Sequence, residues 1–338
     1  MTLHKIFLLI FISTILATPK IVQAVSCGDG VFGNITLTED LFCDTGYTAL
    51  EVFADGVTID LNGHTVSGTG DLAGISIFGY KGVTIRNGAI KGFWAGVNSM
   101  RSHYLTVDNV TFYEGGFGVI ISSASNGYVA HNDFIRTSSA GVSIKNTRAT
   151  LTSQQNVIDN NEFYQAQTGI ELCGDKTNKN TISNNLVWKS VDYAIHLNHS
   201  DNNKLINNRI LETSGNSSVR LNNSSYNLMS GNSIQGGDQY ALTVLANAGG
   251  PCLASDQTRS LKNRFISNSV VNMGQLILLG LGSVSSAEVV GTGITDNRFI
   301  SNSGRIRLEH DAHSSYLRNN VFIDTDSAID DNGTNNHY

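Results

Sequence analysis

Hydrophobic and polar residues alternate in short segments that recur along the chain. In the segment GIEL at residues 169–172, two aliphatic residues flank one acid. Side chains point alternately to the two sides of a strand, so Ile170 and Leu172 should face inward and Glu171 outward. A small residue followed by an aliphatic one returns at Gly74, Gly96, Gly118, Gly141, Ala194, Ser218, Ala241 and Ala328. Helical periodicity is absent after residue 24, so the pattern predicts an all-β chain of short strands.

An asparagine just before a pair of strand-forming residues recurs in step with this frame. It stands at Asn62, Asn87, Asn109, Asn132, Asn161, Asn185, Asn208, Asn232, Asn263, Asn297 and Asn320, mostly 22–25 residues apart. Such a repeat is too short for two packed helices but suits three strands and three turns per coil. Asparagine tolerates left-handed turns, and asparagines stacked about 4.8 Å apart bond one another in a ladder. We therefore predict a single-stranded parallel β-helix of about 11–12 coils with an Asn ladder.

The motif G-[IV]-x-[LI]…N-x-I-x-x-N resembles the parallel β-helix repeat of the pectate-lyase-like superfamily. The stretch VTIDLNGHTV at residues 57–66 resembles the opening of NosD-like bacterial β-helix proteins. This resemblance covers about residues 50–330 and implies a right-handed β-helix. It transfers no catalytic residue, because the G-H-G, N-T-D and R-I-K motifs of polygalacturonases are missing. The only proline after residue 24 is Pro251, so the proline-containing signatures of mannuronan epimerases and pectate lyases are missing too.

The first 24 residues have the features of a secretory signal peptide. A short start with Lys5 precedes an apolar run at residues 6–17, and small residues precede the expected cleavage after Ala24. We expect residues 1–24 to be removed, residues 25–48 to form an N-terminal capping segment and residues 49–338 to form the β-helix. The mature protein would then be secreted or periplasmic.

Export permits disulfide bonds. Cys27 and Cys43 flank the first mature segment and are expected to pair and pin that end. Cys173 and Cys252 lie about three coils apart. They would pair only if the long loop near residues 246–262 folds back, so the sequence leaves this pairing open.

The net charge of −6 argues against a nucleic-acid partner, which usually requires a basic face. Removal of the signal peptide takes away two lysines and no acids, which makes the mature chain more acidic. No later apolar stretch is long enough for a membrane helix. Copper binding, which the NosD-like resemblance implies, has little support from residue types, because only three methionines follow the first residue. The spacing of His310 and His313 suits a metal site, but without a third ligand we interpret this segment as a surface loop.

Candidate chemistry lies on the outward face of the first strand in each coil. Glu171, His196 and Arg220 fall at equivalent positions of consecutive coils, and Lys145 lies one coil earlier. For a uronate substrate, His196 would act as base or acid, since an ordinary imidazole titrates near working pH. Arg220 and Lys145 would neutralise the substrate carboxylate. Glu171 would orient His196 or hold a cation such as Ca²⁺, and no other cofactor is indicated.

Aromatic and amide side chains near this face are candidates for binding a polysaccharide, because sugar rings offer C–H faces and hydroxyl edges. The set consists of Trp94, Tyr164, Trp188, Tyr193, Tyr240, Asn198 and Asn222. We favour a lyase or epimerase acting on an acidic glycan. One alternative is a glycoside hydrolase that uses Glu171 with Asp192 or Glu212. Another is a glycan-binding, surface or structural protein without catalysis, in which the charged line is a solvated strand face.

Overall fold

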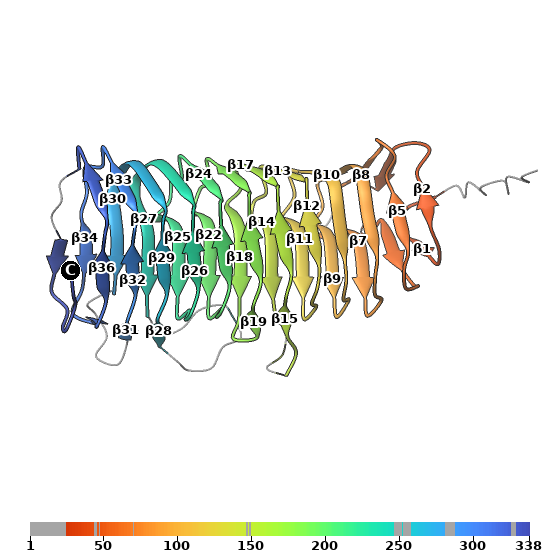
Figure 1. Ribbon diagram of the computed structural model, residues 1–338. Helices are drawn as coiled ribbons and strands as arrows, with labels where there is room; N and C mark the ends of the chain where they lie inside the picture. The colour runs from red at the N-terminus through yellow and green to blue at the C-terminus, as the bar shows by residue number, and fades with distance from the viewer. Residues whose placement is uncertain are drawn as a thin grey trace, which may run out of the picture.

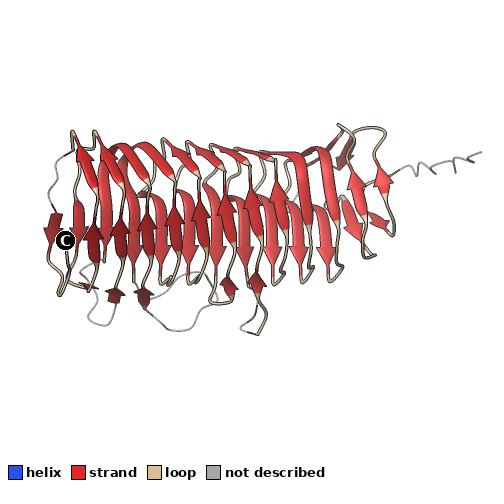
Figure 2. Cartoon of the chain, viewed as in Figure 1, coloured by secondary structure: helices blue, strands red, loops and turns tan. Residues whose placement is uncertain are grey.

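The computed structural model describes residues 25–338 apart from 44, 45, 47, 70, 147, 149, 247–251, 253–257, 281–287 and 326–328. The expected signal peptide lies outside the described residues. Where the chain is described it forms strands and turns, and no helix occurs there (Figure 2). The described residues therefore contain no helix that is long and apolar enough to cross a membrane.

The chain winds into an elongated solenoid of about twelve turns, with three strands in each full turn (Figure 1). Each strand pairs in parallel with the equivalent strand one turn later, so three long sheets run along the molecule. The segment GIEL lies in the first of these sheets, TIS at residues 181–183 in the second and LVW at residues 186–188 in the third. The predicted all-β parallel solenoid is confirmed.

The first sheet contains the longest strands and carries the candidate site. Its strands are β1 (Asp29–Val31), β4 (Leu50–Val52), β7 (Ala73–Phe78), β9 (Ala95–Met100), β11 (Phe117–Ser122), β14 (Ala140–Lys145), β18 (Thr168–Cys173), β22 (Tyr193–Asn198), β25 (Ser217–Asn222), the later parts of β27 (Ser233–Leu245) and β30 (Ser269–Leu279), β34 (Ile306–Leu308) and β38 (Ile329–Asp331).

The second and third sheets consist of shorter strands. The second holds β2 (Ile35–Thr36), β5 (Thr58–Asp60), the first parts of β8 (Thr84–Lys91) and β10 (Thr106–Tyr113), β12 (Tyr128–Ala130), β16 (Val157–Asp159), β20 (Thr181–Ser183), β23 (Lys204–Ile206), β26 (Leu228–Ser230), β29 (Arg264–Ile266), β32 (Gly293–Thr295) and β36 (Tyr316–Arg318). The third holds β3 (Leu41–Cys43), β6 (Thr65–Gly68), the later parts of β8 and β10, β13 (Asp133–Ile135), β17 (Glu162–Tyr164), β21 (Leu186–Trp188), β24 (Arg209–Leu211), the first parts of β27 and β30, β33 (Arg298–Ile300) and β37 (Val321–Ile323).

Short strands on the loops between the first and second sheets make two small sheets. They are β15 (Ser153–Gln154) with β19 (Thr177–Asn178), and β28 (Arg259–Leu261) with β31 (Glu288–Val290) and β35 (Ala312–His313).

The core is a set of aliphatic and aromatic columns inside the three sheets. Ile170 and Leu172 are fully buried, as the alternation predicts. Phe112, Phe134 and Phe163 stack with ring centroids 4.9 and 4.7 Å apart along the solenoid. A side chain at Gly141 would collide with the Phe163 ring. This explains why a small residue precedes the aliphatic residue in first-sheet strands that pack against these rings. Burial of these columns supplies the main favourable term for folding.

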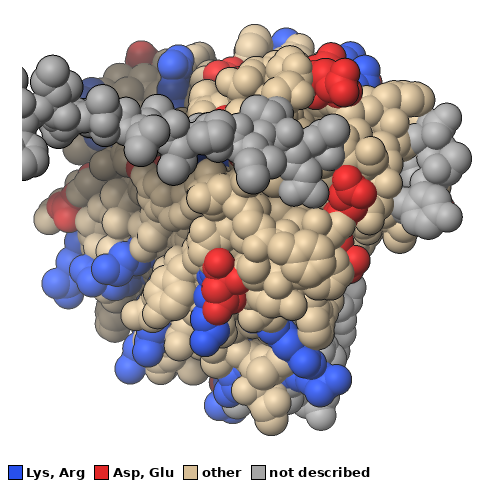
Figure 3. Space-filling model, turned by 90° about the vertical axis from the view of Figure 1, so that its right-hand side faces the viewer, with Lys and Arg blue, Asp and Glu red and all other residues tan. Residues whose placement is uncertain are grey.

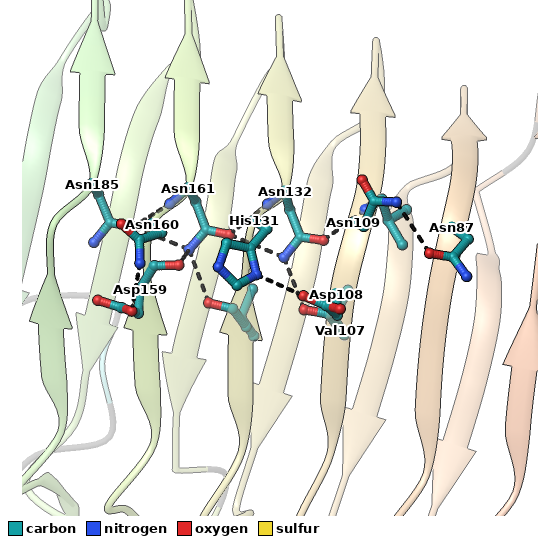
Figure 4. A network of polar contacts seen from close by, with 12 residues as sticks. Asn87, Val107, Asp108, Asn109, His131, Asn132, Asp159, Asn160, Asn161 and Asn185 are labelled. Carbon is teal, nitrogen blue, oxygen red and sulfur yellow. Dashed lines mark hydrogen bonds and ion pairs between the residues drawn. The ribbon is translucent and has the colours of Figure 1, made fainter. Parts of the chain in front are cut away.

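A ladder of buried asparagines runs along the corner between the second and third sheets (Figure 4). The Asn185 amide donates to Asn208 Oδ1 at 3.0 Å, and the Asn208 amide donates to Asn232 Oδ1 at 3.0 Å. The predicted ladder is thus confirmed for these residues. Its members are Asn132, Asn161, Asn185, Asn208, Asn232, Asn268, Asn297 and Asn320.

Four asparagines assigned to that ladder from the sequence lie elsewhere. Asn263 ends a second ladder, at the corner between the first and second sheets, and Asn268 takes its expected place. The second ladder consists of Asn156, Asn180, Asn203, Asn227 and Asn263. Asn62, Asn87 and Asn109 hold the left-handed position (φ 51–59°) just before the ladder. Asn263 was misassigned because both corners place an Asn before a strand, and the other three because an Asn also suits the left-handed residue that precedes the ladder position.

Two disulfides tie the described chain together. Cys27 and Cys43 are bonded, as predicted. The strands β1, β2 and β3 of this segment pair in register with β4, β5 and β6. The pairing that the sequence left open is also formed. Cys173, at the end of β18, is bonded to Cys252, which follows β27.

At the N-terminal end of the solenoid, acidic and basic side chains are scattered over a mostly uncharged surface, and some of them lie next to each other (Figure 3). Phe32 and Phe42, in and beside the first strands, are exposed by 73% and 65%. Neither sign of charge forms a large patch on the part of this face that the view leaves uncovered.

Candidate functional site

Strand register places three polar side chains of the first sheet in one line. Glu171 on β18 pairs with His196 on β22, and His196 pairs with Arg220 on β25. Ser143 on β14 precedes them and donates its hydroxyl to Glu171 Oε2 at 3.1 Å. The predicted line of an acid, an imidazole and a guanidinium therefore exists on consecutive turns.

The face around this line is covered more than the sequence indicates. Ile120, Ser143 and Thr243 point outward and are nevertheless buried, and Glu171, His196 and Arg220 are partly buried. Long side chains of neighbouring turns cover the face, because they lie along the solenoid axis. Arg220 extends across the Tyr193 ring, for example. The outward face is therefore only partly exposed in this region.

Tyr193, the first residue of β22, completes the cluster. Its ring centroid lies 4.8 Å from that of His196. The Arg220 Nη1 donates a hydrogen bond to the Tyr193 hydroxyl at 2.7 Å, and the guanidinium carbon lies 5.4 Å from the tyrosine ring centroid. The Tyr193 phenol thus contacts both the His196 imidazole and the Arg220 guanidinium, on two adjacent strands.

Burial and charge determine the protonation of His196. Desolvation, and then the positive charge of Arg220, lower the pKa of His196 from 6.5 to about 4. The ring is therefore neutral at neutral pH, and the expectation that it titrates near working pH is wrong. As a neutral ring it accepts a proton but does not serve as a ready acid.

Two polar atoms of the cluster are buried without a hydrogen-bond partner, His196 Nε2 and Arg220 Nε. Buried polar atoms are normally satisfied, so such exceptions often mark functional sites. No ion pair joins Arg220 to a carboxylate among the described residues.

Lys145, Asn198 and Asn222 lie one outward position further along the strands. Lys145 and Asn198 lie on the strands on either side of β18, and each pairs with Cys173. The Lys145 ammonium lies over the Phe117 ring, 5.5 Å from its centroid. Asn222 donates to Asn198 Oδ1 at 3.1 Å, and both amides are buried. The two asparagines are therefore covered, whereas Lys145 is partly exposed, like Glu171, His196 and Arg220.

The remaining predicted aromatic residues do not gather around the cluster. Trp94 packs edge-on against Phe117, near the N-terminal end of the first sheet. Tyr164 and Trp188 end strands of the third sheet and contact each other, with ring centroids 4.9 Å apart. Tyr240 accepts a hydrogen bond from Arg307 at 3.4 Å. Tyr164 and Trp188 are separated from the cluster because they precede a corner and so belong to the third sheet. Tyr240 lies on the first sheet, where it pairs with Ser217, the first residue of the strand after that of Tyr193.

A groove of about 550 Å³ opens at the corner between the third and first sheets. Polar side chains of Gln165, Lys189, Glu212, Thr213 and Ser214 line it, together with Val191 and Gly237. The Lys189 ammonium lies 3.8 Å from Glu212 and 4.9 Å from the Trp188 ring centroid. Sequence reasoning missed Gln165 and Lys189, whose only signal is their place directly after a third-sheet strand.

The carboxylates suggested for a hydrolase are divided between two elements. Glu171 lies on the face of the first sheet and hydrogen bonds to Ser143. Glu212 lies at the corner beside Lys189, and Asp192 lies at the corner just before β22. The hydrolase pairing stays a prediction, and no shared contact joins these acids within the described part of the chain.

Metal-binding residue types do not converge. The described residues contain no group of three or more His, Cys, Asp or Glu able to hold a metal ion. Cys173 and Cys252 are bonded to each other. His313 Nδ1 hydrogen bonds to the Thr334 hydroxyl at 2.6 Å. These residues do not fit a copper centre, whose preferred ligands are free thiolate, thioether and imidazole groups.

Two family models match the sequence. One is described as a right handed beta helix region and matches residues 48–210. The other is described as a periplasmic copper-binding protein (NosD) and matches residues 149–276. A search of curated proteins finds no match.

Solved structures of similar fold include enzymes and an adhesin. The mannuronan C-5 epimerase A-module of Azotobacter vinelandii has a TM-score of 0.69 and 14% identity, over 91% of this chain and 90% of that chain. An alginate lyase from Paenibacillus has a TM-score of 0.55 and 13% identity, over 76% and 92%. A surface adhesin of Streptococcus pneumoniae has a TM-score of 0.52 and 13% identity, over 91% and 90%. At these identities the likeness shows the fold, and the comparisons together show a right-handed parallel β-helix.

Proposed function

We propose that this right-handed parallel β-helix protein binds an acidic polysaccharide on the outer face of its first sheet and cleaves or epimerises it beside Tyr193, His196 and Arg220. One observation carries the proposal. Arg220 lacks a carboxylate partner in the described structure and touches a phenol beside a neutral imidazole. Similar folds in a mannuronan epimerase and an alginate lyase add support.

Arg220 and His196 have separate roles in removing the proton next to a uronate carboxylate. Arg220 pairs with that carboxylate and stabilises the negative charge that develops on it. Neutral His196 accepts the proton. Because the charge of Arg220 lowers the pKa of His196, a bound carboxylate that neutralises Arg220 strengthens His196 as a base.

The fate of the resulting carbanion distinguishes the two reactions. In elimination, its electron pair forms a carbon–carbon double bond while the bond to the glycosidic oxygen breaks, and Tyr193 donates its hydroxyl proton to that oxygen. Arg220, which already hydrogen bonds to the Tyr193 hydroxyl, then stabilises the phenolate. In epimerisation, the carbanion takes up a proton from water on the opposite side of the ring, His196 releases the abstracted proton to solvent, and no glycosidic bond breaks.

A panel of acidic and neutral polysaccharides tests the proposal. Ultraviolet absorbance detects the unsaturated product of a lyase, and NMR in heavy water detects the solvent hydrogen that an epimerase introduces. We expect His196→Gln and Arg220→Met to lower the rate by about 100-fold or more, the usual effect of losing such groups. Arg209→Met is the matched control, because Arg209 is exposed on the third sheet. Equal activity of all three variants would contradict the site assignment.

Binding without catalysis is the second candidate, and the fold shared with a streptococcal surface adhesin favours it. It predicts saturable binding of an acidic glycan that Arg220→Met weakens, with no unsaturated product and no solvent exchange. Either function fits our proposal that the chain is exported, which the two disulfides support.

A further inference from the structure

The corner groove lies beside an interruption in a column of corner side chains. Gln165, Lys189 and Glu212 occupy equivalent left-handed corner positions (φ 51–57°) on three consecutive turns. On the next turn this position is Gly236, also left-handed, and on the turn after that it is Asn272. The column of outward side chains is therefore interrupted at Gly236, next to Gly237 in the groove wall.

The groove is polar without carrying a net charge. Glu212 compensates the ammonium of Lys189, which the Trp188 ring also contacts. Gln165, Thr213 and Ser214 add amide and hydroxyl groups, and Val191, which is 46% exposed, adds an apolar contact. Such a lining suits the hydroxyl edges and C–H face of an uncharged sugar. Arg220, without a carboxylate partner in the described structure, suits an anion.

The groove and the cluster are close neighbours along the chain. Val191 in the groove wall is two residues before Tyr193, a span of about 7 Å in extended backbone. The hydroxyl of Tyr193 contacts Arg220 directly. Tyr193 therefore lies between Arg220 and the groove wall, so the two are close enough for adjoining sugars of one glycan.

We propose that the natural ligand is a heteropolysaccharide in which a uronate adjoins a neutral sugar, with the uronate at Arg220 and the neutral sugar in the corner groove. This inference rests on the proposed function and specifies its substrate class. A homopolymer of uronates would place a second carboxylate in the groove, where Glu212 already neutralises Lys189 and no net positive charge remains to offset the cost of desolvating it.

Binding of two glycan types tests this assignment by calorimetry. One is a homopolyuronate, and the other is a polymer that alternates a uronate with a neutral sugar. We expect the full-length mature protein to bind the alternating polymer about tenfold or more tightly, the equivalent of one or two hydrogen bonds. Gly236→Asn should remove this preference. It restores a side chain that tolerates left-handed backbone, and its Cβ would meet Glu212 Cγ at an ordinary 3.5 Å.

A charge variant provides an independent test. Glu212→Gln leaves Lys189 uncompensated, so homopolyuronate affinity should rise severalfold. Glu114→Gln is the matched control, because Glu114 occupies an earlier corner of the same column and pairs with Lys91 and Arg136 away from the groove. Equal binding of both polymers, unaffected by Gly236→Asn, would overturn the inference and leave the proposed function standing. If neither polymer binds, or if Arg220→Met binds both as well as the unaltered protein, the proposed function itself fails.

Discussion

Acidification should destabilise the fold through His196. Folding lowers the pKa of this ring from 6.5 to about 4, chiefly because the ring is desolvated and secondly because Arg220 lies beside it. Between these two values the unfolded chain binds a proton that the folded chain does not. The contribution of the neutral His196 ring to the free energy of unfolding is therefore fully present above about pH 6.5 and is lost as the pH falls toward 4.

The size of the effect follows from the shift. A difference of about 2.5 pKa units corresponds to about 3 kcal/mol, since each unit is worth about 1.4 kcal/mol. Urea unfolding of the unaltered protein and of His196→Gln, from about pH 8 to about pH 4, measures this quantity as the pH-dependent part of their difference. Taking the difference cancels the titration of other groups.

NMR titration of the ring provides a direct measurement. Arg220→Met should raise the pKa of His196 part of the way toward 6.5, because it removes the second cause and leaves the desolvation. A pKa near 6.5 in the unaltered protein, or a difference in stability that does not change with pH, would refute the reasoning.

Three further predictions concern the stability and covalent structure of the solenoid. Asn208→Ala removes four ladder hydrogen bonds and should lower the free energy of unfolding, measured by urea titration, by about 3 kcal/mol. The control Asn202→Gly, at an exposed left-handed corner, should change it by less than about 0.5 kcal/mol, and equal effects would contradict the ladder's importance. The double variant Cys27→Ser/Cys43→Ser, which opens a loop with a sequence separation of 16, should lose about 3 kcal/mol in the same assay, and an unchanged value would count against that bond. Mass spectrometry of protein from an oxidising compartment should find one peptide pair linked through Cys173 and Cys252, and free thiols at these positions would contradict that bond. The same measurement should find a mature N-terminus at Val25, and a retained leader would contradict the expected cleavage.

The candidate site was only partly predictable. The pairing of Glu171, His196 and Arg220 followed from alternation, because Ile170, Ile195 and Val219 can only face inward. The contact of Tyr193 with His196 and Arg220 did not follow, because it depends on how a side chain at the start of a strand lies across its neighbours. The corner groove was missed for a similar reason, since it arises where a column of side chains from separate turns is interrupted.

Local pattern determined the fold of this protein. A period of two within strands, a repeat of 22–25 residues and asparagines at left-handed corners are sufficient for a parallel solenoid, because each turn needs only the next turn to bury its core and satisfy its backbone. Tertiary structure alone decided which of two corners each asparagine occupies, whether Cys173 meets Cys252, and how deeply His196 is buried. These features depend on distances between turns and on the cover that neighbouring side chains provide. The pKa of His196, and with it the proposed chemistry, is therefore a property of the assembled face.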